Sequence, residues 1–171
     1  ETVFDLASLT KPLATAVSLM WLVQERKVGL DETLGIAIPD FLQTDKESIT
    51  VRQLLSHTAG LPDYRPYYQG LSKVPTANRK TLLKELLLNE ELSYEPGTNC
   101  IYSDLGFMIL EWLVEVAAKR PLDRFMEDAI CRLLGLNDLF FVPLKGESRR
   151  EARAYAATED CPWRGETLEG K

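Results

Sequence analysis

The 171-residue sequence has few of the residues that build metal sites and disulfide frameworks. It contains one histidine, His57, and three widely spaced cysteines, Cys100, Cys131 and Cys161, with no CxxC pair. One imidazole and scattered thiols offer no ligand spacing, so we predict no metal ion. We expect buried free thiols, a usage that slightly favours the reducing cytoplasm but leaves the localisation unassigned.

Other absences exclude whole classes of protein. No apolar run is long enough to cross a bilayer, so no membrane segment is expected in this chain. The net charge is −6 with acidic and basic residues intermixed, which argues against a nucleic-acid partner because phosphate binding needs a basic face. Neither a GxGxxG nor a P-loop glycine pattern occurs, and we predict no cofactor.

The residues that are present describe one globular, mostly helical domain over residues 1–171, with 45% hydrophobic and 27% charged residues. Pro12 fits only in or just after the first turn of a helix, so the first helix is expected to begin close to Ser8 and to stop before Gly29. The remaining pattern predicts helices at 51–56, 77–88, 103–119 and 121–134, short strands at 2–4 and 139–142, an irregular stretch at 31–45 and a long loop at 58–70.

Ser8 and Lys11 are the first candidate catalytic pair. Residues three apart on a helix share a face, so the lysine amine can approach the serine hydroxyl, a weak nucleophile that needs a base. A helix start also offers free N–H groups to a developing oxyanion. The alternative is that Ser8 caps the helix and Lys11 faces solvent.

Tyr102 and His57 are further candidates. Tyr102 precedes a helix start and could hold a proton during acid-base steps; alternatively it is a partly buried tyrosine beside a capping Asp104. A Ser-His hydrolase would have to use His57, which more simply serves as a hydrogen-bonded residue at a helix-to-loop junction. The tyrosines of the 58–70 loop could line a groove or anchor the loop; they are Tyr64, Tyr67 and Tyr68.

Three segments in order resemble the serine β-lactamase and penicillin-binding-protein superfamily, in particular its class C β-lactamase-like branch with esterases and DD-peptidases. They are FDLASLTK at 4–11, LLSHTAGLP at 54–62 and YSDLG at 102–106. The resemblance implies that Ser8 is acylated, that Lys11 takes or relays its proton and that Tyr102 shares the acid-base work. It also implies that Asp104 contacts the substrate and that the Ser8 N–H stabilises the oxyanion.

The chain departs from that family at two places. Many β-lactamases have Asn where Asp104 stands, and an ionised Asp only accepts hydrogen bonds. Asp104 can pair with Lys11, which would raise the lysine pKa and favour esterase or peptidase-like use. The family's third motif, Lys-Thr-Gly or His-x-Gly, is absent, since Lys145-Gly146-Glu147 does not match it.

We therefore expect an incomplete fragment of the family's α/β (α+β) fold: the helical lobe plus the nucleophile helix, with the main antiparallel sheet largely missing. Because loss of one oxyanion donor costs roughly 100- to 1,000-fold in rate, the isolated fragment is expected to be inactive. Surface left by the missing sheet is expected to favour self-association. The parent is predicted to be a serine hydrolase of small-molecule ester, amide or β-lactam carbonyls; the alternative is a non-catalytic penicillin-binding-like scaffold.

Overall fold

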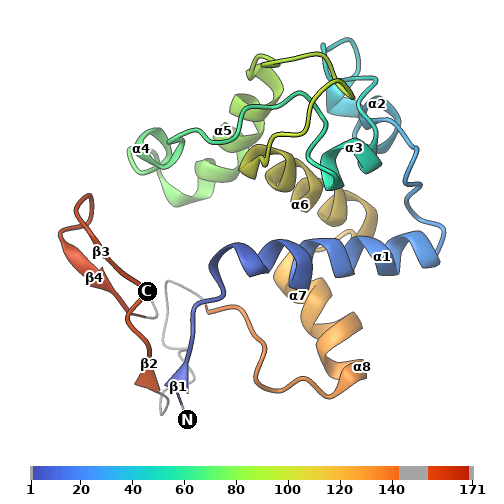
Figure 1. Ribbon diagram of the computed structural model, residues 1–171. Coiled ribbons are helices and arrows are strands. Elements are labelled where there is room, and N and C mark those ends of the chain that lie inside the picture. The colour runs from blue at the N-terminus through green and yellow to red at the C-terminus, as the bar shows by residue number, and fades with distance from the viewer. Residues whose placement is uncertain (1, 143–153, 170–171) are drawn as a thin grey trace.

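A computed structural model describes residues 2–142 and 154–169, and helices dominate this part of the chain. Figure 1 shows α1 (Val17–Gln24) crossing the middle of the molecule, between α6 (Asp104–Ala118) on one side and α7 (Leu122–Met126) on the other. The strands form two small two-stranded sheets, β1 (Thr2–Val3) parallel to β2 (Ala154–Tyr155) and β3 (Glu159–Cys161) antiparallel to β4 (Glu166–Leu168). The predicted mostly helical fold without an extensive sheet is confirmed.

The first helical segment changes its geometry along its length. It runs from a 3-10 turn, η1 (Ala7–Leu9), through a π-helical stretch, η2 (Lys11–Ala16), into α1. Pro12 has no N–H to donate to the carbonyl four residues earlier, which removes one α-helical hydrogen bond at this point. The segment begins beside Ser8 as predicted but ends at Gln24, earlier than the predicted stop before Gly29.

Capping residues define the helix starts in the middle of the chain. Thr50 and Gln53 form a reciprocal capping box at the start of α3 (Val51–Leu55). Ser103 caps α6, because its Oγ accepts the Gly106 N–H at 3.2 Å. The other helices here are α2 (Leu34–Ala37), η3 (Pro39–Phe41), α4 (Tyr68–Leu71) and α5 (Thr76–Asn89). The segments predicted as irregular, 31–45 and 58–70, therefore contain or enter short helical turns.

The third helical region confirms the prediction for 121–134. It comprises α7, η4 (Glu127–Cys131) and α8 (Arg132–Leu134), and Gly135 ends it with a φ of +67°. The strand predicted at 139–142 is wrong: the described structure assigns these residues to neither a strand nor a helix, and strand propensity alone does not form a strand. The Lys145-Gly146-Glu147 triplet lies outside the described residues.

A leucine-rich core fixes the first helical segment against α3 and α6. Leu19 and Leu22 of α1, Leu54 of α3, and Leu105 and Ile109 of α6 are all 0–1% exposed. Each such side chain contributes about 1.5–3 kcal/mol when buried. The packing therefore sets the start of α6 against the segment that begins at Ser8.

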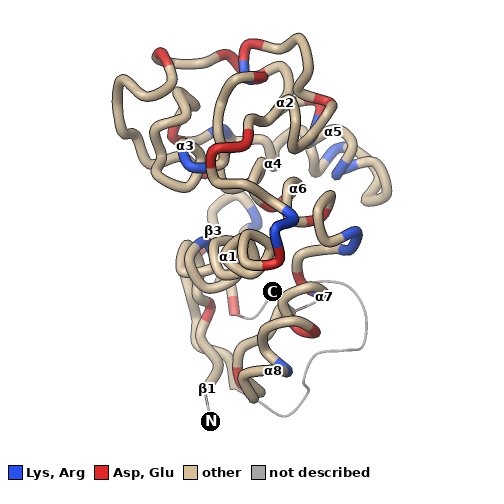
Figure 2. The backbone as a smooth tube through the Cα atoms, turned by 90° about the vertical axis from the view of Figure 1, so that its right-hand side faces the viewer, with Lys and Arg blue, Asp and Glu red and all other residues tan. Residues whose placement is uncertain are grey.

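The surface agrees with part of the sequence analysis. Lys and Arg segments alternate with Asp and Glu segments along the chain (Figure 2), as the intermixed sequence predicts. In the described residues no helix is both long and apolar enough to span a membrane. Among the cysteines only Cys131 is buried; Cys100 is exposed and Cys161 is intermediate, so the expectation of buried thiols is wrong for those two. Both lie outside the helical core, in a loop and in β3.

Candidate active site

Ser8 lies exposed in the η1 turn at the start of the first helical segment. Asp5 Oδ1 accepts the Ala7 N–H at 2.8 Å, and the Leu6 carbonyl accepts the Leu9 N–H at 2.8 Å. Ala7 itself has a φ of +44°, which is costly for a residue with a Cβ. The turn therefore holds Ser8 at the surface through a strained backbone conformation.

Lys11 connects the nucleophile candidate to α6. Its Nζ donates a hydrogen bond to Ser8 Oγ at 3.2 Å and lies 2.7 Å from Asp104 Oδ1. Burial alone would lower the lysine pKa, but hydrogen bonds to Asp104 and Tyr102 raise the pKa above its ordinary value. Lys11 is consequently an ammonium ion that donates to the serine oxygen. The predicted pairing of Asp104 with Lys11 is present.

Tyr102 completes the cluster from the loop before α6. Lys11 Nζ lies 5.0 Å from the centre of its ring, and half of the tyrosine is exposed, at 52%. Hydrogen bonds to Lys11 and to Ser8 lower the pKa of the phenol, and the nearby lysine charge adds to this. A lowered pKa means that this phenol ionises more readily than an ordinary tyrosine and that its phenolate is a weaker base.

The loop that carries Tyr102 is bound to the 57–63 loop. The Ile101 N–H donates to the His57 carbonyl at 3.0 Å, and the Asp104 N–H donates to the Asp63 carbonyl at 2.8 Å. The buried Ser103 hydroxyl donates to the Pro62 carbonyl at 2.6 Å. These bonds place Tyr102 and Asp104 at the α6 start and explain why two of the recognised motifs lie together.

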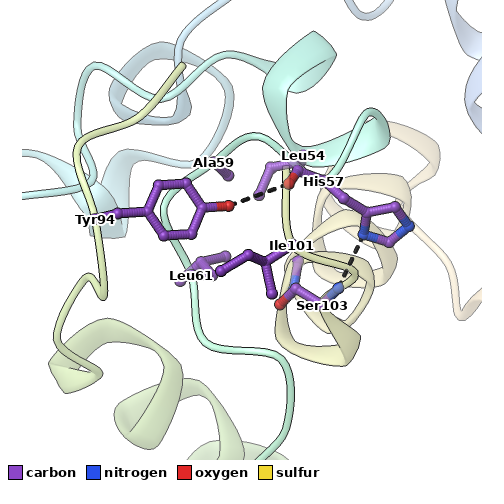
Figure 3. A pocket seen from close by; sticks show the side chains of 8 residues that line it. Leu54, His57, Ala59, Leu61, Tyr94, Ile101 and Ser103 are labelled. Atoms are coloured by element: carbon purple, nitrogen blue, oxygen red, sulfur yellow. Dashed lines mark hydrogen bonds between the residues drawn. The ribbon is translucent and has the colours of Figure 1, made fainter. Parts of the chain in front are cut away.

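His57 is part of this connection. Its Nδ1 accepts the Ser103 N–H at 3.0 Å, and its carbonyl accepts the Tyr94 hydroxyl at 3.2 Å (Figure 3). Burial, and then the charge of Lys11, lower the histidine pKa, while Asp104 opposes that shift. The hydrogen-bonded histidine at a helix-to-loop junction is confirmed, and the Nδ1 atom is already engaged by a backbone donor rather than by Ser8.

The hollow beside His57 does not form a ligand site. Figure 3 shows Tyr94, Leu54, Leu61 and Ile101 around it, and the lining is packed too tightly to admit a water molecule. Within residues 2–142 and 154–169, no three His, Cys, Asp or Glu side chains gather as a metal site would require. The exposed group at Ser8 lies apart from this hollow, whose lining does not include Ser8, Lys11 or Tyr102.

The three tyrosines of the 58–70 loop differ in their surroundings. Tyr67 donates to Glu90 Oε2 at 2.5 Å, and Arg65 Nε pairs with the same carboxylate at 2.9 Å, so Tyr67 anchors the loop. Tyr64 and Tyr68 are exposed at 49% and 40%. Of the two interpretations of these tyrosines, loop anchoring applies to Tyr67.

Sequence reasoning missed the roles of Ser103 and Pro62 in holding the candidate site. The occurrence of both LSHTAGLP and YSD in one chain indicates that the two loops lie together, but neither motif predicts which of their atoms form hydrogen bonds. Ser8, Lys11, Tyr102 and Asp104, in contrast, are all brought together. Chemically, the group combines a hydroxyl, a fixed positive charge and a phenol with a lowered pKa, a set of groups that is compatible with acyl transfer.

Comparison with known proteins gives one consistent result. The family model described as Beta-lactamase matches residues 1–168. A protein of Escherichia coli (strain K12), provisionally named D-alanyl-D-alanine carboxypeptidase, is 34% identical over 166 residues, covering 92% of this chain and 38% of that protein. A protein of Salmonella agona with the same provisional name is 35% identical over 84% of this chain and 35% of its own length. The chain therefore spans little more than a third of these relatives.

Solved structures show the same fold. A beta-lactamase/D-alanine carboxypeptidase from Pseudomonas syringae matches 80% of this chain and 36% of its own, with a TM-score of 0.67 and 25% identity. A mutant class C beta-lactamase matches 91% of this chain and 40% of its own, with a TM-score of 0.71; at 20% identity this likeness is one of fold alone.

Proposed function

The chain belongs to the beta-lactamase family, and from that premise we propose that it forms the nucleophile side of a serine acyl-transfer site. The observation that carries the proposal is the convergence on Ser8 of Lys11 and Tyr102. Lys11 Nζ donates to Ser8 Oγ at 3.2 Å, and a hydrogen bond between Tyr102 and Ser8 contributes to the lowered phenol pKa.

In the proposed reaction, Ser8 Oγ attacks a substrate carbonyl carbon and its proton passes to the Tyr102 phenolate oxygen. Lys11, held as an ammonium by Asp104, stabilises that phenolate and the reacting oxygen without giving up its own proton. The Ser8 N–H at the helix start donates to the carbonyl oxygen as negative charge develops there. Tyr102 then returns the proton to the leaving group, and water hydrolyses the acyl-enzyme by the same steps in reverse.

The substrate class we propose is a small molecule with an ester, amide or β-lactam carbonyl. Relatives provisionally named as carboxypeptidases of a D-alanyl-D-alanine peptide favour a peptide amide. Asp104 supports that preference. Its carboxylate is ionised beside Lys11 and can only accept hydrogen bonds, so it suits a substrate N–H, which an amide can offer, rather than a substrate carbonyl.

We further propose that the 171-residue chain is a single partial domain with no substantial turnover by itself. Its sequence contains no Lys-Thr-Gly or His-x-Gly triplet, which in the resembling family supplies the opposite wall of the cleft. Loss of one oxyanion donor costs roughly 100- to 1,000-fold, and loss of a wall removes positioning as well.

Acylation measured by mass spectrometry tests the proposal. The complete gene product is incubated with a p-nitrophenyl ester panel, a chromogenic cephalosporin and a D-alanyl-D-alanine peptide. We expect one acyl adduct on Ser8, release of product from at least one substrate, and loss of both in Ser8→Ala. The 171-residue chain serves as the comparison, with slow or no turnover expected.

The competing function is a non-catalytic scaffold of the same fold. A complete gene product that binds these compounds reversibly, with Ser8→Ala binding as tightly and with no adduct, would establish the scaffold and reject the hydrolase. Fold likeness cannot separate the two, because the same fold hosts both enzymes and binding proteins.

A further inference from the structure

We infer that His57 is a positioning residue whose neutral imidazole holds the Tyr102–Ser103 segment so that the phenol stays at Ser8 and Lys11. The inference rests on the proposed function, since it deepens the role of Tyr102. It concerns a side chain that the proposed proton transfers do not use, on a loop far from Ser8 in sequence.

The first support is the hydrogen bond into the Tyr102 loop. His57 Nδ1 accepts the Ser103 N–H at 3.0 Å, as the dashed line in Figure 3 shows. Ser103 is only 4% exposed, so its N–H has little access to water as an alternative partner. An imidazole nitrogen accepts only when it carries no proton, which requires His57 to be neutral with its proton on Nε2.

The second support is the fixed placement of the ring. The imidazole lies with its centre 4.6 Å from the Tyr102 ring and 5.2 Å from the Phe107 ring. The His57 backbone has a φ of +59°, and its carbonyl accepts from Ile101 N–H and from Tyr94 O–H. The ring therefore lies directly against the Tyr102 ring, and two hydrogen bonds hold the carbonyl of the residue that carries it.

The charges around His57 set the sign of its response to pH. Facing it are Lys11 from η2, Tyr94 and Tyr102 from the loop before α6, and Asp104 from the start of α6. Burial and the Lys11 charge keep the neutral imidazole dominant at neutral pH, against the opposing effect of Asp104. Protonation would place a hydrogen on Nδ1, so two N–H donors would face each other. The hydrogen bond from Ser103 N–H would then break and the Tyr102–Ser103 segment would be released.

The tautomer is measured first, in the unchanged chain, by long-range nitrogen–proton NMR of the imidazole. At pH 7.5 we expect a neutral ring with the proton on Nε2. As the pH falls below about 6.5, the ordinary histidine value, we expect the Ser103 amide to shift together with the His57 titration. A proton on Nδ1 at pH 7.5, or a Ser103 amide that ignores the titration, would overturn the inference without any variant being made.

Three variants then separate positioning from general structural support. His57→Phe keeps an aromatic ring and removes the acceptor, so Ser103 amide exchange should become roughly fivefold faster and the Tyr102 pKa should rise toward about 10. His57→Asn offers an acceptor oxygen and tolerates a positive φ, so it should restore both values. Tyr94→Phe removes one of the two bonds to the His57 carbonyl but keeps the Nδ1 acceptor, so it should move the Tyr102 pKa in the same direction as His57→Phe and by less.

The Tyr102 pKa is read from the ring carbon of the phenol, assigned by subtraction with Tyr102→Phe. An Asn variant that behaves like the Phe variant, or a Tyr102 pKa that is the same in all of them, would rule the positioning role out. None of these readouts needs turnover. If the Ser103 amide and the Tyr102 pKa respond as expected but the complete gene product is never acylated, the hydrolase is rejected and the positioning role stands. If Ser8 is acylated but these two readouts do not respond, only the positioning role is rejected.

Discussion

The Nζ atom of Lys11 lies 2.7 Å from Oδ1 of Asp104, so the ammonium group is bound by a carboxylate before any substrate is present. The same atom donates to Ser8 Oγ at 3.2 Å. A lysine held in this way stabilises negative charge on its neighbours and is a poor proton acceptor, which supports the proposed role of Tyr102 as the base.

Asp104→Asn should lower the Lys11 pKa relative to the unchanged chain. The carboxylate hydrogen bond and its charge both raise the lysine pKa, and Asn removes the charge. The measurement is an NMR titration of the Lys11 side-chain carbon next to Nζ. Asp31→Asn, which breaks the exposed ion pair with Arg52, is the matched control and should leave Lys11 unchanged. Equal Lys11 titrations in all three proteins would contradict the prediction.

Tyr102→Phe should reduce acylation of Ser8 in the complete gene product by roughly 100- to 10,000-fold, the usual contribution of a positioned acid-base group. The free energy of unfolding should change by only about 0.5 kcal/mol, because the tyrosine is half-exposed. Tyr68→Phe removes another exposed hydroxyl and should retain full rate. Burst kinetics and urea unfolding report the two quantities, and a Tyr102→Phe protein acylated at the normal rate would exclude this tyrosine as base.

Gly60→Ala should destabilise the chain by about 2 kcal/mol. Gly60 has a φ of +83°, and a Cβ at this position would collide with the Tyr94 carbonyl oxygen. Gly70→Ala is the control, because a Cβ there meets nothing within 4 Å; inside α4 it should stabilise by roughly 0.5–1 kcal/mol. Denaturant unfolding measures both, and similar effects for the two substitutions would contradict the clash.

Glu111→Gln should raise the melting temperature at pH 7.5 and lose this advantage near pH 4. Burial raises the carboxyl pKa; Lys80 opposes the shift, and Glu115 and Asp123 add to it. Because the pKa of Glu111 is higher in the folded chain than in the unfolded chain, its carboxyl contributes to stability in the protonated form. This contribution is fully present below the unfolded pKa, near 4.5, and is lost as the pH rises through the folded pKa.

Glutamine stays neutral at all pH values, so the variant does not lose the stability that the unchanged chain loses when Glu111 ionises. Calorimetry at pH 7.5 and near pH 4 measures the two melting temperatures. Glu85→Gln, on the exposed side of α5, is the control and should change the melting temperature little at either pH. The prediction is contradicted if Glu111→Gln lowers the melting temperature at pH 7.5 and raises it near pH 4, each compared with the unchanged chain at the same pH.

Self-association should appear as a concentration-dependent mass in sedimentation. Along the N-terminal segment, large apolar side chains are exposed: Phe4 at 68%, Leu9 at 57%, Leu13 at 40% and Met20 at 69%. Patches of this kind are usually covered by another surface. Phe4→Ser combined with Leu13→Ser should weaken the association, whereas Leu133→Ser on α8 should not. A mass independent of concentration would count against the idea.

The sequence predicts the local part of the candidate site better than its long-range part. The three-residue spacing of Ser8 and Lys11 suffices to anticipate their contact, because helical geometry acts over a single turn. The pairing of Lys11 with Asp104 joins residues far apart in the sequence, and only the resemblance to a known family suggests it. The bond between His57 and Ser103 joins residues 46 apart, and only the packing of α3 on α6 creates it. Periodicity carries no information on such a pair.

Two other features of the structure do not follow from a local sequence pattern: an unusual backbone conformation and an extended run that forms no strand. The φ of +44° at Ala7 contradicts the preference of alanine, and the surrounding turn imposes it. The run 139–142 has strand-forming residues, but the described structure assigns none of them to a strand, so propensity alone overpredicts it. Both cases depend on contacts that a local pattern does not encode.

The bonds between the 57–63 and 93–104 loops also have an evolutionary consequence. Ser93 N–H donates to the Gly60 carbonyl at 2.8 Å, so the chain between these residues leaves and returns at nearly one point. The cost of closing such an excursion rises only with the logarithm of its length. Insertions and deletions around α4 can therefore accumulate among homologues while Tyr102 and Asp104 stay in register with Ser8, and new substrate preferences can arise there without rebuilding the reactive centre.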